Sequence, residues 1–71
     1  MSFQNAIINL ASRTNSLYEF DSENVAHLIE RGKDGKPSKN VWRKTFIFSD
    51  GKVTVKVHGK TLAVKPLSAL A

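Results

Sequence analysis

The side chains best able to do chemistry in this chain are cations, and nearly all of them lie in its second half. Residues 1–30 carry one basic and four acidic side chains, a balance of −3, whereas residues 31–71 carry ten and two, a balance of +8. Such an asymmetry is typical of a surface that attracts polyanions or acidic proteins, although net charge also serves solubility alone. The residues predicted to contact an acidic partner are Lys33, Lys36, Lys39, Arg43, Lys52, Lys56, His58 and Lys65.

Histidine and carboxylates form a second pattern of reactive groups. On a helix, Glu23 and His27 would lie one turn apart with Glu30 a further turn on, a spacing that suits a divalent metal or proton transfer. A solvated helix face with a weak ion pair explains the same spacing, and it is the interpretation we favour. No serine or threonine lies at a spacing from histidine and carboxylate that suggests a catalytic triad. We therefore expect no enzyme, no metal and no cofactor.

A phosphate-binding loop is also excluded. Gly59-Lys60-Thr61 resembles the end of such a loop, but the glycine that the motif requires upstream falls at Thr54. The three residues also join two expected strands instead of opening a helix.

The elements that would position the cations are two successive β-hairpins in residues 41–65. Asp-Gly is the strongest short hairpin signal, so we expect a two-residue turn at Asp50-Gly51. That turn places Phe48 opposite Val53, and Phe46 two residues further on opposite Val55. All four apolar side chains then lie on one face of the sheet.

A second turn at Gly59-Lys60 would extend the same apolar face. It predicts that Val57 lies opposite Leu62 and Val55 opposite Val64, with strands at roughly 40–48, 52–58 and 61–65. Only Lys44 interrupts the apolar face, which implies a bulge or a lysine stem lying along the rim. The opposite face would be basic and would present Arg43, Lys56, His58 and Lys65.

The first half of the chain predicts covering helices. Residues 3–12 have helical apolar spacing with Ser2 as N-cap, and residues 17–20 are expected to be extended. Residues 21–31 predict a second helix, with Asp21 or Ser22 as its cap and Gly32 as its stop, although a strand is the alternative. Residues 32–40 are expected to form a loop, and residues 66–71 a single helical turn with Leu67 and Leu70 on one side.

The predicted fold is therefore α+β, with one or two N-terminal helices packed on a three-stranded antiparallel β-meander. The alternative is a small SH3-like β-barrel in which residues 24–31 form a strand and residues 32–40 its long first connection. We expect one domain spanning residues 1–71, stabilised without disulfides because there is no cysteine. The N-terminus resembles neither a signal peptide nor a membrane span, so a soluble, cytoplasmic protein with no membrane partner is expected.

The functional expectation is a small non-enzymatic binding protein. Nucleic acid is the favoured partner, because a basic sheet face and a lysine-rich loop can contact a phosphate backbone. The alternative is a protein-docking inhibitor or modulator of a larger macromolecular complex, in which the same basic face meets an acidic protein surface. The sequence leaves the oligomeric state open.

Overall fold

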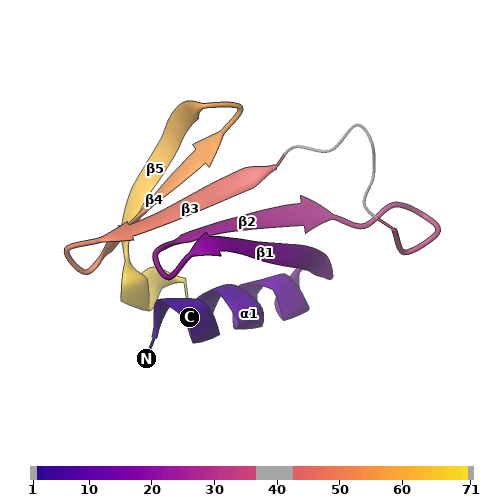
Figure 1. The fold of residues 1–71 in the computed structure, drawn as a ribbon, viewed down its shortest axis with the longest axis horizontal. Helices are drawn as coiled ribbons and strands as arrows, with labels where there is room; N and C mark the ends of the chain where they lie inside the picture. Colours follow the sequence, from indigo (N-terminus) through magenta and orange to yellow (C-terminus); the bar gives the residue numbers. More distant parts are fainter. Residues whose placement is uncertain (1, 37–42, 71) are drawn as a thin grey trace.

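The computed structural model describes residues 2–36 and 43–70, which form one α-helix, five β-strands and a short 3-10 turn (Figure 1). All strands are antiparallel and neighbouring strands follow chain order, so the sheet is an open five-stranded meander. This confirms an α+β meander, but with five strands instead of three, and it excludes the barrel because β5 does not pair with β1. The elements are α1 (Phe3–Arg13), β1 (Ser16–Ser22), β2 (Val25–Glu30), β3 (Lys44–Ser49), β4 (Lys52–Val57), β5 (Lys60–Pro66) and η1 (Leu67–Ala69).

The predicted N-terminal helix is confirmed as α1. The hydroxyl of Ser2 accepts a hydrogen bond of 3.1 Å from the Asn5 amide, which satisfies one of the free donors of the first turn. Four side chains at helical spacing are buried, so one stripe of the helix packs on the sheet. They are Phe3, Ala6, Ile7 and Ala11.

The predicted second helix is wrong, because residues 16–30 form the β1–β2 hairpin instead. The stretch predicted to be extended, 17–20, lies in β1 and obtains its backbone partners from β2, which directly follows the turn. The expected cap, Ser22, accepts a hydrogen bond from the Asn24 amide of that turn. Ala26 and Leu28 point toward α1, whereas Ile29 is buried on the opposite face of the sheet. Because this strand has apolar residues on both faces, their spacing in the sequence resembles that of a helix.

The β3–β4 hairpin has the predicted register. Phe48 lies opposite Val53 and Phe46 opposite Val55. Asp50 and Gly51 both have positive φ, as a two-residue type I′ turn requires. The part of the predicted first strand before residue 43, including Trp42, lies outside the described residues.

The β4–β5 turn lies one residue earlier than predicted, and the register differs with it. The turn residues with positive φ are His58 and Gly59, so Val57 lies opposite Lys60. A type I′ turn places glycine second, as in Asp50-Gly51, and histidine tolerates the left-handed region better than most residues do. The pairing then shifts at Leu62, so Val55 faces Ala63 instead of Val64.

The core lies between α1 and one face of the sheet. The stacked rings of Phe3 and Phe48, 5.3 Å between centroids, join the start of the helix to the end of β3. The closing turn η1 brings Leu70 into the same cluster, with Leu67 partly buried beside it, as predicted. The buried members are Phe3, Ala6, Ile7, Ala11, Ala26, Leu28, Phe46, Val53, Val55 and Leu70.

Candidate nucleic-acid interface

The meander brings cations from four segments of the chain to one end of the sheet. In an antiparallel meander the end of β2, the start of β3, the end of β4 and the start of β5 all lie at the same end of the strands, which in Figure 1 is the right-hand end of β2 and β3 and the upper end of β4 and β5. We call residues 31–36, 43–44 and 56–60 the basic end. Its cationic residues are Arg31, Lys33, Lys36, Arg43, Lys44, Lys56 and Lys60, and His58 lies in its last turn.

Acidic residues are few at the basic end. Asp34 lies within it and Glu30 directly precedes it. At the opposite end of the sheet, the β1–β2 turn holds Glu23 and the β3–β4 turn holds Asp50, so Lys52 and Lys65 share that end with two acidic residues. The charge difference between the two halves of the sequence thus becomes a difference between two regions of the molecule.

The predicted contact residues divide between these two ends. Arg43, Lys56 and His58 lie at the basic end, as do the loop residues Lys33 and Lys36. Lys52 and Lys65 lie at the opposite end, because their cross-strand partners there are Ser49 and Val53. Lys39 is outside the described residues.

The position of Lys65 corrects the predicted basic face. Lys65 lies opposite Val53, and residues directly opposite one another share a face, so it projects on the side of α1. Lys56 lies opposite Thr45 and Thr61 on the other face. The cause is the bulge at Leu62, which moves the residues of β5 that follow it to the other side.

Lys44 and Lys60 were not among the predicted contacts, yet they belong to the basic end. Both lie opposite Val57, so they share the face toward α1. One intervening strand separates them, which corresponds to about 10 Å at the usual spacing of strands. The position of Lys44 on the apolar face was visible in the sequence, whereas that of Lys60 depended on the turn. The basic end therefore has cations on both faces.

The first part of the loop after β2 holds Lys33 and Lys36 in a defined turn. Arg31 donates to the Gly35 carbonyl at 3.1 Å, and the Gly32 amide donates to the Lys36 carbonyl at 2.7 Å. The Asp34 carboxylate accepts from the Lys36 amide at 3.0 Å. Because these bonds fix the backbone, Lys33 and Lys36 need little further ordering to meet a partner.

Between residues that the structure describes, no ion pair joins a lysine or arginine of the basic end to a carboxylate. Across residues 2–36 and 43–70, the single ion pair joins His27 to Asp21. Lys33, Lys36, Arg43 and Lys60 are exposed. Their charges are consequently directed at solvent, where a polyanion could replace small counterions.

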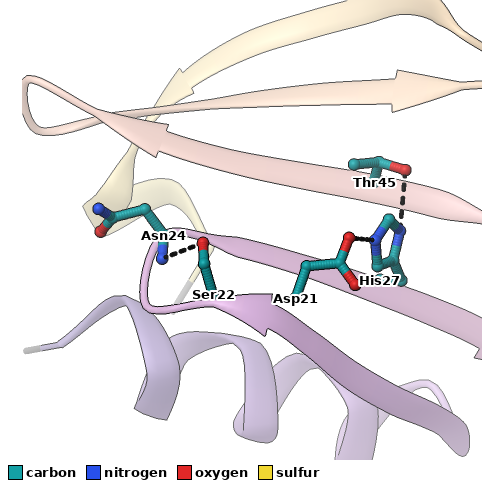
Figure 2. A network of polar contacts seen from close by, with 5 residues as sticks. All are labelled: Asp21, Ser22, Asn24, His27 and Thr45. Atoms are coloured by element: carbon teal, nitrogen blue, oxygen red, sulfur yellow. Dashed lines mark hydrogen bonds and ion pairs between the residues drawn. The ribbon is translucent and has the colours of Figure 1, made fainter.

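Figure 2 shows the most organised polar cluster on the face away from α1. His27 Nε2 lies 2.6 Å from Asp21 Oδ2, and His27 Nδ1 lies 3.1 Å from Thr45 Oγ1. A carboxylate, an imidazole and a hydroxyl in sequence form the pattern of an activated nucleophile. Here, however, Thr45 lies within the central strand β3, whose amides bond to β2 and β4 and so do not form an oxyanion hole. We interpret the cluster as a clamp that fixes the register of β1, β2 and β3.

The arrangement predicted for Glu23, His27 and Glu30 does not form. Glu23 lies in the β1–β2 turn, and His27 and Glu30 lie on opposite faces of β2. No group of three potential metal ligands is present in the described part of the chain. Among the same residues, no helix is long and apolar enough to cross a membrane.

Comparisons with protein-family models, with curated proteins and with solved structures find no match to this chain.

Proposed function

We propose that this chain is a non-enzymatic nucleic-acid-binding protein that contacts the phosphate backbone with its basic end. The observation that carries the proposal is the gathering of seven cationic side chains from four separate segments at one end of the sheet. Lysine and arginine contacts to phosphate release counterions, and this release supplies most of the affinity in sequence-independent binding.

The proposed mode is backbone contact to a duplex, without base recognition. None of the aromatic side chains in the described ranges lies within the basic end, so stacking on the bases of single strands has no support there. The cations lie on both faces of the sheet and on the loop, so the sheet could approach a groove of the duplex end-on, with phosphates on either side. Such a contact positions the protein on a nucleic acid but reads no sequence.

The salt dependence follows from the number of cations that one duplex can reach. Cations on opposite faces of the sheet do not all meet the same duplex, so we expect about four phosphate contacts. This corresponds to a slope of log affinity against log salt concentration of about −3 to −5. A slope near zero would contradict the proposal.

Two charge-reversal variants with equal net charge test where the contact lies. Lys36→Glu with Arg43→Glu removes two cations of the basic end, and Lys52→Glu with Lys65→Glu removes two from the opposite end. Each pair lowers the net charge from +5 to +1. All four residues are exposed, so both variants should remain folded.

The measurement is fluorescence anisotropy of a labelled 16-base-pair duplex at a series of salt concentrations. The basic-end variant should bind at least ten-fold more weakly at low salt. The slope of its log affinity against log salt concentration should be less steep by about two. The opposite-end variant should lose much less affinity. Equal losses would show that net charge alone drives binding and would refute the proposed interface.

A further inference from the structure

A groove lies on the face of the sheet toward α1, between that helix and the β4–β5 hairpin. Its volume is about 920 Å³. Leu28 and Phe46 from the central strands form its floor. Leu10 of α1 lines one side, and Val57 and Leu62 of the β4–β5 hairpin line the other. A space of this size and apolar character is typical of a binding site.

The groove exists because one helix is too narrow for this sheet. Strands are spaced about 4.8 Å apart, so five strands span about 19 Å, whereas a helix with its side chains is about 10 Å wide. Figure 1 shows α1 lying along β1 and β2, with β4 and β5 rising away from it. As a result Leu62 is 67% exposed although it borders the apolar floor.

The groove continues alongside α1 toward the C-terminal turn. A second hollow of about 330 Å³ extends it, and the two share Leu10, Lys44, Phe46 and Leu62. Leu70 and Ala69 line its far end. The uncovered space is therefore elongated.

The side chains around this space determine the charge of a fitting partner. Lys44 and Lys60 line the groove, and Lys65 and Arg13 line its extension. Among the described residues that line either hollow, Glu30 is the one acidic side chain. An apolar floor with a largely cationic rim is complementary to a partner with an apolar face and acidic flanks.

We propose that the groove binds an acidic amphipathic α-helix of a partner protein, which packs beside α1 as the second helix of the layer. A helix fits because it satisfies its own backbone hydrogen bonds, and the central strands of the floor have no free backbone groups to pair with an extended chain. Strands of six or seven residues are about 20 Å long, which corresponds to a helix of about 10 to 14 residues. Leucines at i, i+3, i+4 and i+7 would meet the floor, and glutamates beside them would meet the lysines.

This proposal does not require nucleic-acid binding, since it depends on the apolar floor toward α1, although Lys44 and Lys60 belong both to the groove rim and to the basic end. Its probe is a designed 14-residue helical peptide with leucines at those positions and glutamates on either side. A second peptide replaces every glutamate with lysine. Titration of each peptide into the ¹⁵N-labelled full chain maps the contact by amide chemical shifts. We expect the acidic peptide to shift Leu10, Leu28, Phe46 and Leu62, and to bind at least ten-fold more tightly than the basic peptide.

Two substitutions on one strand provide a matched pair. Leu62→Glu places a carboxylate in the groove, whereas Val64→Glu introduces the same charge on the other face, where Val64 is 56% exposed and lies opposite Thr54. Leu62→Glu should weaken binding of the acidic peptide at least ten-fold, and Val64→Glu should change it less than two-fold. Binding of the duplex should be equal in the two variants, so failure of this proposal is separable from failure of the nucleic-acid interface.

Several outcomes would overturn the proposal. One is equal binding of the two peptides, and another is equal loss in the two variants. A third is that the amide chemical shifts of the groove residues change with protein concentration when no peptide is present. That result would show that a second copy of the chain occupies the groove. A fourth is saturation of the groove by laurate when the acidic peptide does not bind, because the ligand would then be a small anionic amphiphile.

Discussion

Two neighbouring isoleucines on α1 allow the packing of the helix on the sheet to be measured directly. Ile7 is fully buried, with 0% of its surface exposed, whereas Ile8 is 39% exposed. Ile7→Ala and Ile8→Ala make the same chemical change at adjacent positions of one helix. Because both substitutions alter helix propensity equally, the difference between them isolates the burial of the Ile7 side chain.

The expected difference is large relative to the stability of the whole protein. Truncating a buried isoleucine to alanine typically costs about 2 to 5 kcal/mol, which includes the cavity left behind. At about 0.05 to 0.15 kcal/mol per residue, a chain of 71 residues has a free energy of unfolding of about 4 to 11 kcal/mol. Ile7→Ala should therefore remove a major part of the stability, and Ile8→Ala less than about 1 kcal/mol.

Urea denaturation followed by far-ultraviolet circular dichroism measures both values. The free energies of unfolding come from the midpoints and slopes of the transitions, and the slopes should remain similar to that of the unsubstituted protein. If the two variants lost equal stability, or if Ile8→Ala lost more, α1 would not pack on the sheet through the face described above. The groove beside α1 would then also lack its Leu10 wall.

Three further predictions concern the local features of the fold. His58→Asn converts the β4–β5 turn to Asn-Gly and should raise the free energy of unfolding by a few tenths of a kcal/mol in the same urea assay, whereas a turn at Gly59-Lys60 would give no gain. A double-mutant cycle with His27→Ala and Thr45→Val should give a coupling energy of about 0.5 to 1.5 kcal/mol, and a value of zero would contradict the clamp in Figure 2. Ser2→Ala should cost about 1 kcal/mol by loss of the N-cap, and an unchanged midpoint would contradict that role.

The parts of the fold that were predictable are those with local chemical signals. Ser2 marks the start of α1 because its hydroxyl bonds to a neighbouring amide, and Asp50-Gly51 marks the β3–β4 turn because both residues tolerate positive φ. Each signal depends on residues within one turn of the chain. The tertiary packing agrees with both local signals, so the predicted helix start and turn are observed.

The parts that were not predictable depend on partners distant in the sequence. Val25, Leu28 and Ile29 have a spacing that suits a helix as well as a strand, and the choice depends on whether β1 and β3 lie on either side. Both candidate turns around Gly59 contain that glycine, and they differ by one residue. The extra residue at Leu62 reverses the face of the side chains that follow it in β5, which is why the predicted position of Lys65 was wrong.

The charge pattern was predictable as an asymmetry but not as a site. The sequence shows that cations dominate after residue 30, but the prediction made from it placed them on one face of a sheet. The meander collects them at one end instead, from both faces and from the loop before residue 37. The groove was not predictable, because it results from the width of the sheet relative to a single helix.

The most direct test of the central claim is a chemical-shift map of the unsubstituted protein with a 16-base-pair duplex at low salt. The proposed interface predicts that amides of residues 31–36, 43–44 and 56–60 shift together, while those of residues 50–53 and 65 remain near their free positions. Uniform small shifts over the whole surface, or the largest shifts at residues 50–53, would contradict it.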